Sequence, residues 1–170
     1  MVWGDKYSNM LQWSTDQLAP LEGDSIALPK FDSNLAWEIG NAARNLAIEK
    51  FPASPVVVDI TLTSGQVLFH ATSGNGTALD NDDWVRRKRN SVFKFGKSSL
   101  FMGAKVRSKG VPISEALYVS ATDYAVHGGS VPIRVKGSDV VIGALTVSGL
   151  AQGDDHLVAI KTLEKFAKES

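Results

Sequence analysis

The spacing of hydrophobic and polar residues predicts three long helices. In the first, apolar residues recur every three or four positions up to Lys50, and Asp32 or Ser33 can cap its start. The second is expected over residues 80–95, with Asp80 as the cap at its start. The third should span about residues 154–168, where apolar residues form a stripe along one face.

Shorter helical segments are expected around this framework. A helix should run from Ser98 to Gly110, and one or two helical turns should follow over residues 112–117. Near the start of the chain, residues 3–17 have the apolar spacing of a short amphipathic helix. We interpret residues 1–31 as an N-terminal extension and residues 32–170 as the main domain.

Two hairpins alternate with the helices. Residues 55–62 are rich in β-branched side chains and are followed, after a turn, by a returning strand over 67–71. Residues 131–135 and 140–147 form a second such pair. Paired hairpins favour an antiparallel sheet, so the sequence predicts a layered α+β domain with a single antiparallel sheet between helices.

Composition indicates one globular domain. The chain has 170 residues, of which 44% are hydrophobic and 21% charged, close to the average of soluble domains. It has no cysteine, which excludes disulfide scaffolds, cysteine nucleophiles and thiolate metal sites.

The formal net charge of zero argues against nucleic acid as a partner. Lys plus Arg equals Asp plus Glu at 18 each, whereas nucleic-acid binders are usually basic overall. No apolar stretch approaches the ~20 residues of a membrane helix, and the first residues do not resemble a secretory signal. We therefore expect a cytoplasmic protein that binds no nucleic acid and does not insert into a membrane.

The three histidines differ in their surroundings. His70 lies in a predicted strand and His156 in the first turn of the last helix, and both positions favour a structural role. His127 directly precedes Gly128 and Gly129, and glycines permit a tight turn and the close approach of a ligand. His127 is therefore a candidate to ligate iron or transfer a proton, although its ring could instead cap the turn.

Basic residues cluster in the second helix and just after it. Six positive charges fall within 12 positions: Arg86, Arg87, Lys88, Arg89, Lys94 and Lys97. Arginines of this kind can bind carboxylate or phosphate groups of a ligand. They can equally form ion pairs with four nearby carboxylates or with a neighbouring subunit. These carboxylates are Asp59, Asp80, Asp82 and Asp83.

Several familiar motifs are absent. The glycine-rich segment 72–77 lacks the Lys-Ser/Thr of a phosphate-binding loop. Ser148 does not sit in a nucleophile elbow, because Thr146 stands where that motif requires glycine. Three histidines without cysteine make a poor zinc site.

Three blocks in the same order carry a family resemblance: Asp80–Asn90, His127–Arg134 and Thr146–His156. With them, residues 32–168 resemble the haem-degrading-domain family of GlcG-like and HbpS-like proteins, and in particular its uncharacterised fungal and bacterial branch. The resemblance implies a profilin-like fold with about five antiparallel strands. It also implies homo-oligomers, often large and symmetric, and some relatives bind or break down haem.

Three functional readings stay open. In the first, the protein is a homo-oligomeric interaction or adaptor protein with itself and other cytosolic proteins as partners. Its N-terminal segment, with Trp3, Tyr7 and Trp13, would be an exposed or exchanged arm, and pairs of the Arg87–Asp80 type would fix the interface. The residues assigned to the oligomer or to structural motifs are Asp80, Asn81, Asp83, Trp84, Ser148, Gly149, Asp155 and His156.

The second reading is haem (tetrapyrrole) binding or degradation, in which haem is the cofactor and His127 ligates its iron. The ligand-binding set is His127, Gly128, Gly129, Arg86, Arg87, Arg89, Tyr124, Phe95 and Phe101. The third reading is an enzyme or sensor that takes another small anionic ligand in the same pocket. The sequence identifies no catalytic residue.

Overall fold

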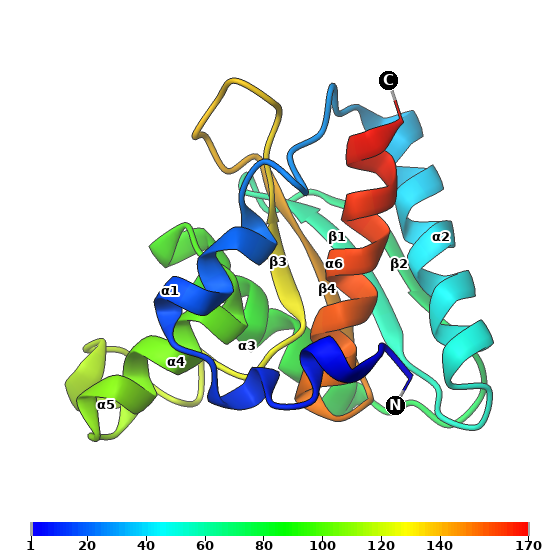
Figure 1. Cartoon of the computed structure of the whole chain (residues 1–170). Coiled ribbons are helices and arrows are strands. Elements are labelled where there is room, and N and C mark those ends of the chain that lie inside the picture. Colours follow the sequence, from blue (N-terminus) through cyan, green and yellow to red (C-terminus); the bar gives the residue numbers. More distant parts are fainter. Residues whose placement is uncertain (1, 170) are drawn as a thin grey trace.

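A four-stranded antiparallel sheet forms the centre of the protein. In the computed structural model, which describes residues 2–169, the strand order is β2-β1-β4-β3 (Figure 1). The strands are β1 (Val57–Leu62), β2 (Val67–Thr72), β3 (Ser130–Ile133) and β4 (Gly143–Ser148). The predicted single antiparallel sheet is confirmed, and the two central strands, β1 and β4, are almost entirely buried.

The expected count of about five strands is wrong. Where a fifth strand could extend the sheet, the N-terminal segment makes one isolated bridge, between Leu28 and Val135. The second hairpin is also shorter than predicted, because β3 ends at Ile133 and β4 begins at Gly143. Residues 134–142 between them form a largely exposed loop with a turn at Gly137, which adopts a positive φ of 84°.

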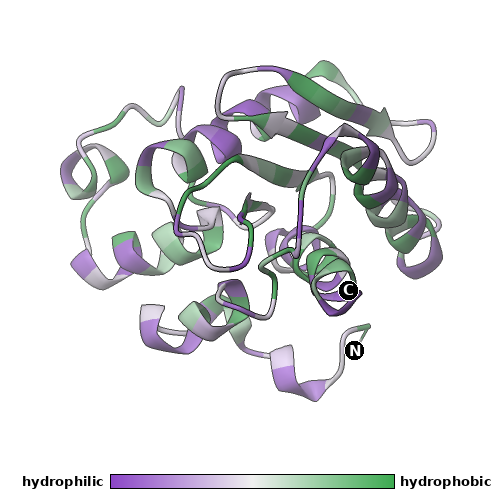
Figure 2. Ribbon diagram, turned by 90° about the horizontal axis from the view of Figure 1, so that it is seen from above, coloured by the Kyte–Doolittle hydropathy of each residue, from purple (hydrophilic) through white to green (hydrophobic). Residues whose placement is uncertain are grey.

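Three long helices cover the sheet. The first, α2 (Ser33–Lys50), and the last, α6 (Gln152–Lys168), pack side by side on one face, and α3 (Leu79–Phe95) packs on the other. Figure 2 shows that these helices have a hydrophobic side and a hydrophilic side. Their apolar sides meet the sheet in one main core that includes Ile39, Ile60, Leu145 and Ile160.

Capping residues explain where the helices begin. The predicted cap of α2 is confirmed, since Asp32 accepts a hydrogen bond from the backbone N–H of Leu35 at 2.8 Å. Asp80, however, is not the cap of α3. The side-chain oxygen of Asn81 instead accepts a hydrogen bond from the Ala78 N–H at 2.9 Å, so the helix begins at Leu79.

The expected shorter helices also form. Ser98 caps α4 (Ser99–Lys109) by accepting the N–H of Phe101, and Gly110 ends this helix in the left-handed conformation. One further turn, α5 (Ile113–Ala116), follows. Together with the loop after it, this region packs around a second, smaller apolar cluster centred on Met102 and Leu117.

The N-terminal segment is folded against the rest of the chain. The predicted helix over 3–17 is wrong: short 3-10 turns come first, and within residues 2–31 the only α-helical turn is α1 (Thr15–Leu18). Tyr7 and Met10 are buried in the main core, and Arg107 of α4 donates hydrogen bonds to the carbonyls of Leu11 and Trp13. The expected exposed arm is therefore wrong for this fold.

No helix within residues 2–169 is long and apolar enough to span a membrane.

Candidate functional site

A pocket of about 390 Å³ lies where the start of α3 approaches the start of α6. It is bounded on one side by the first turns of α3 and on the other by the segment that joins β4 to α6. The lining residues are Asp80, Asn81, Trp84, Lys88, His127, Ser148, Gly149, Leu150, Gln152 and Asp155. Residues far apart in the sequence therefore converge on one cavity.

A buried ion pair forms the deep end of the pocket. Lys88 and Asp155 are only 3% and 2% exposed, and Lys88 Nζ donates to Asp155 Oδ2 at 3.2 Å and to the Val147 carbonyl at 3.3 Å. Burial lowers the pKa of Lys88, although Asp155 opposes this effect. Burial raises the pKa of Asp155 to about 6, against the opposing influence of Lys88 and the N–H groups of Leu150 and Gly149.

His127 lies at the exposed rim of the same pocket. Its ring packs against Trp84 in a T-shaped arrangement, with an interplanar angle of 79° and the two ring centroids 5.0 Å apart. Partial burial, together with the positive charges of Lys88 and Arg87, lowers the pKa of His127. The imidazole is therefore neutral at pH 7 and keeps a lone pair on one ring nitrogen. Neither nitrogen has a hydrogen-bond partner among residues 2–169.

Trp84 connects the histidine to the basic residues of α3. The guanidinium carbon of Arg87 lies 4.3 Å from the centre of a Trp84 ring, within the range of a cation–π contact. Lys88 Nζ lies 6.0 Å from the same residue's ring. The indole of Trp84 therefore lies close to a neutral imidazole and to two cations.

Gly128 and Gly129 are needed for close packing of the chain itself. A Cβ atom on Gly128 would collide with the Gln152 carbonyl, and one on Gly129 would collide with the Val147 carbonyl and lie 2.8 Å from Lys88 Nζ. Gly129 also has a φ of 135°, which favours glycine. Both glycines are buried, so the space beside them is filled by protein.

His156 is enclosed directly behind these glycines. It is 1% exposed, and its Nδ1 accepts the backbone N–H of Gly129 at 3.1 Å. Burial, followed by the charge of Lys88, lowers the pKa of His156 to about 3, so this ring stays neutral. Its contacts agree with a structural role.

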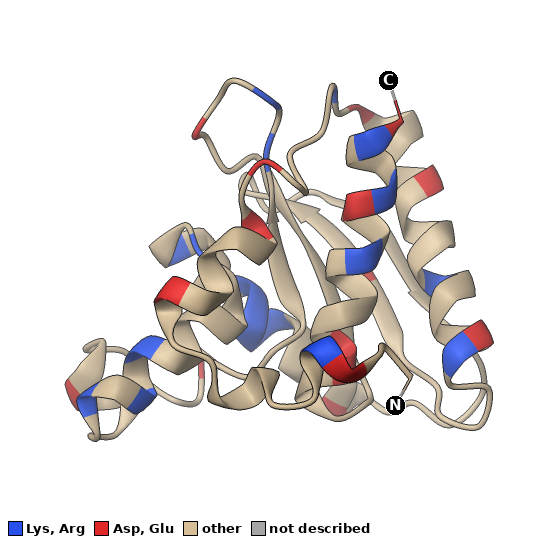
Figure 3. Cartoon of the chain, viewed as in Figure 1, with Lys and Arg blue, Asp and Glu red and all other residues tan. Residues whose placement is uncertain are grey.

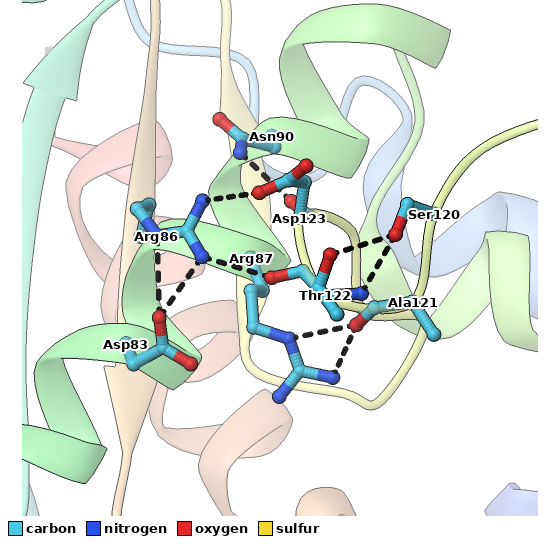
Figure 4. Close-up of polar contacts among 8 residues, drawn as sticks. All are labelled: Asp83, Arg86, Arg87, Asn90, Ser120, Ala121, Thr122 and Asp123. Atoms are coloured by element: carbon cyan, nitrogen blue, oxygen red, sulfur yellow. Dashed lines mark hydrogen bonds and ion pairs between the residues drawn. The ribbon is translucent and has the colours of Figure 1, made fainter.

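Two arginines of the basic cluster hold a neighbouring loop. Figure 3 shows Lys and Arg gathered on α3, and Figure 4 shows what Arg86 and Arg87 bind. Arg86 donates to the carboxylates of Asp83 and Asp123 and to the Thr122 carbonyl, while Arg87 donates through two nitrogens to the Ala121 carbonyl. We call Arg86, Arg87 and Asn90 the loop latch, since Asn90 also donates to the Asp123 carbonyl at 2.8 Å.

Arg89 faces a different network, which is centred on Asp59 of β1. Asp59 is buried and accepts hydrogen bonds from Arg89 at 3.3 Å and from Thr61 at 2.6 Å. Its second oxygen contacts His70 Nδ1 at 2.8 Å, and His70 Nε2 contacts Asp82 at 2.9 Å. Burial lowers the pKa of His70, but the two carboxylates outweigh this effect and raise it overall.

The structure therefore divides the predicted ligand-binding set. His127 lines the pocket and Arg87 contacts its wall, but Arg86 and Arg89 are engaged by carboxylates elsewhere. Phe95, Phe101 and Tyr124 pack against the small apolar cluster and do not line this pocket. Most of the residues expected to serve the oligomer or structural motifs line it instead: Asp80, Asn81, Trp84, Ser148, Gly149 and Asp155.

The remaining members of that second set lie beside the pocket. Asp83 binds Arg86 at 2.9 Å, and His156 is buried behind Gly129. Arg87 and Asp80 do not pair with each other within residues 2–169, where Arg87 instead bonds to the Ala121 carbonyl.

Sequence reasoning missed Lys88 as a pocket residue and counted it only among the basic cluster. One signal was available, because Asn81, Trp84 and Lys88 are spaced by three and four residues and so share one face of α3. Leu150 and Gln152 carry no comparable signal, since they line the pocket only through the path of the chain between β4 and α6.

Comparison with known proteins identifies the family. A family model described as "Haem degrading protein HbpS-like" matches residues 31–164. The chain belongs to this family. The resemblance recognised in the sequence is thus confirmed.

Two relatives show how much of the chain is shared. The UPF0303 protein YBR137W of Saccharomyces cerevisiae is 43% identical over 175 residues, which cover 100% of this chain and 96% of the yeast protein. The UPF0303 protein SCO2848 of Streptomyces coelicolor is 42% identical over 140 residues, or 82% of this chain and 85% of that protein.

Solved structures extend the likeness to the fold. The crystal structure of Ybr137w has a TM-score of 0.90 and 37% identity, covering 97% of this chain and 94% of that chain. HbpS has a TM-score of 0.60 at 18% identity, covering 79% and 88% of the two chains. The PduOC:heme complex has a TM-score of 0.65 at 18% identity, covering 82% and 95%. Because HbpS and PduOC are each 18% identical to this chain, these comparisons show that the three proteins share a fold.

Proposed function

We propose that this HbpS-like protein binds haem, with His127 as the ligand of the iron. The observation that carries the proposal is the state of His127: its ring is exposed at a pocket rim, held against Trp84, and its nitrogens are without partners in residues 2–169. A neutral imidazole with a free lone pair is the usual protein ligand of haem iron. The lowered pKa of His127 keeps this form at neutral pH.

The surroundings of His127 suit a flat, partly apolar molecule with acidic groups. Trp84 offers an aromatic wall, and Arg87 has one guanidinium nitrogen, Nη1, that makes no hydrogen bond within the described part of the chain. That nitrogen can bind a carboxylate. Bound haem would supply redox and oxygen chemistry, while the protein supplies the ligand, the wall and the charge.

The family supports the same proposal. Its description names haem degradation, and a structural neighbour was solved as a haem complex. Whether the protein also breaks down haem can be tested in the same experiment as binding.

A haemin titration tests this proposal. Absorption spectra of the parent protein should show a saturable Soret shift near one haemin per chain, and His127→Ala should lose it. His70→Ala is the matched control, because both nitrogens of that half-exposed ring already contact carboxylates. An equal shift in the parent and His127→Ala would refute His127 as the ligand. Loss of the Soret band with reductant and oxygen would extend the function to degradation.

A second proposal concerns self-association, which three large exposed side chains favour. Trp37, Leu79 and Tyr118 are 63%, 82% and 90% exposed, and an interface between copies of the chain would remove such apolar surface from water. We propose that the protein forms homo-oligomers in the cytoplasm. Light scattering after size exclusion should give a mass above 18.3 kDa, and Leu79→Ser should lower that mass if this residue lies at the interface. A monomeric parent would refute the proposal.

A further inference from the structure

The deep end of the pocket holds a hydrogen-bond donor that the protein does not use. The ammonium of Lys88 has three N–H groups, but within residues 2–169 it meets two acceptors, Asp155 and the Val147 carbonyl. Lys88 is 3% exposed and lines the pocket. Its third N–H is therefore left to donate to a molecule that occupies the cavity.

The hydroxyl of a serine opens onto the same cavity. Ser148 is the last residue of β4, is 3% exposed and lines the pocket. Its hydroxyl makes no hydrogen bond within the described chain. The Ser148 hydroxyl and the third N–H of Lys88 can therefore both donate to a ligand that carries acceptors.

Helix ends add to this preference. The first turn of α3, at Asp80 and Asn81, and the first residue of α6, Gln152, all line the pocket. Both helices have 17 residues, and the N-terminal end of a helix carries partial positive charge. The pocket thus combines two helix N-termini with a buried ammonium and a serine hydroxyl that opens onto the cavity.

From these groups we infer a carboxylate-binding site, in which one carboxylate of a ligand accepts hydrogen bonds from Lys88 Nζ and Ser148 Oγ. A monoanion fits better than a phosphate dianion, because the carboxylates of Asp80 and Asp155 line the same pocket and repel additional negative charge. Either a propionate of haem or a free small carboxylic acid can supply this group. The site extends the proposed haem pocket inward but does not require iron to bind His127.

The first test compares two probes of one shape on the parent protein. Calorimetric titration with benzoate should show saturable binding, and benzamide, which is neutral, should bind at least about tenfold more weakly. Equal affinity for the two probes, or no binding of benzoate, would overturn the carboxylate site. This test needs no variant, so it stands whether or not substitutions at Lys88 fold.

Two serine variants locate the bound carboxylate. Ser148→Ala should weaken benzoate binding by about three- to tenfold, the effect of one lost hydrogen bond to a charged group, while leaving benzamide unaffected. Ser138→Ala is the matched control, since Ser138 lies in the exposed loop between β3 and β4. Unchanged benzoate affinity in Ser148→Ala would refute the assignment.

Porphyrins then identify the source of the carboxylate. Haemin carries propionates, whereas iron octaethylporphyrin carries the same metal without them. If haem supplies the carboxylate, Ser148→Ala should weaken haemin binding and leave the octaethyl compound unchanged. If haemin does not bind at all, the iron proposal for His127 fails, while benzoate still decides the carboxylate site. A benzoate effect without a haemin effect identifies a free small acid as the ligand.

Discussion

Lys88 Nζ on α3 lies 3.2 Å from Asp155 Oδ2 on α6, and the two side chains are 4% and 2% exposed. These helices pack on opposite faces of the sheet, so the pair joins them past the end of β4. Asp155 also accepts the N–H groups of Gly149 and Leu150, at 3.3 and 2.9 Å. One carboxylate thus fixes both the buried lysine and the chain segment that enters α6.

Removal of one partner of this pair should be more costly than removal of both charges. Lys88→Met leaves the Asp155 carboxylate buried without its counter-ion, which should lower the free energy of unfolding by about 3 kcal/mol at pH 7.5. The loss should shrink at pH 5, because the pKa of Asp155 is already raised to about 6 and the group is then mostly protonated. Urea denaturation at both pH values measures this difference.

The double variant Lys88→Met/Asp155→Asn completes the cycle. Its loss of unfolding free energy should be smaller than the sum of the losses caused by Lys88→Met alone and by Asp155→Asn alone, since neither charge remains buried. Additive losses would show that the two groups do not interact.

His70 and His127 should respond to pH in opposite directions. The pKa of His70 is raised, so the stability it contributes is present below pH 6.5 and lost as pH rises through its folded pKa. The pKa of His127 is lowered, so the folded state gains stability relative to the unfolded state as pH rises towards 6.5.

Melting temperatures at several pH values test this contrast. As pH rises from 6 to 9, the melting temperature of the parent should fall relative to that of His70→Gln. As pH rises from 5 to 7, the melting temperature of the parent should rise relative to that of His127→Gln. The same trend in both variants would contradict the assigned pKa directions.

Gly129 should tolerate alanine far less well than Gly137. A methyl group on Gly129 would meet the Val147 carbonyl and Lys88 Nζ, so Gly129→Ala should destabilise the fold by about 3 kcal/mol or more. Gly137 also has a positive φ, but nothing lies within 4 Å of the added atom. Gly137→Ala should therefore cost only about 1 kcal/mol of backbone strain. Equal melting temperatures of the two variants would argue against close packing at Gly129.

Local signals made the main elements predictable from the sequence. Asp32 stands where a cap is needed, and β-branched residues mark β1, so the start of α2 and the first hairpin follow from neighbouring residues. The N-terminal segment did not follow its helical spacing, because its shape depends on distant contacts. Tyr7, for example, accepts a hydrogen bond from Lys161 at 2.8 Å.

The candidate site was predictable only in part. His127 was identified from the glycines beside it, and those glycines proved to pack against Gln152 and Val147. The helix spacing could have placed Lys88 on the pocket face of α3, but its buried ion pair could not be inferred, because the counter-ion lies 67 residues later in the chain and the burial depends on how α3 meets β4. Charge alone did not distinguish Lys88 from Arg86, which has its partners at the surface.

The loop latch should control local opening of the segment after α5. Arg86 and Asn90 hold Asp123, and the N–H of Ala125 donates to the Arg87 carbonyl at 3.0 Å. Asn90→Ala removes one of these side-chain contacts, so the amides of Asp123 and Tyr124 should exchange with deuterium about tenfold faster.

The global stability of Asn90→Ala should change little, because Asn90 bonds to the loop at an exposed position and the core is untouched. Hydrogen exchange followed by mass spectrometry measures the opening, and amides of β1 serve as the internal control. Lys94→Ala, on an exposed position of the same helix, is the matched variant and should leave the loop protected. Equal exchange in Asn90→Ala and the parent would mean that the backbone bonds of the loop suffice to keep it closed.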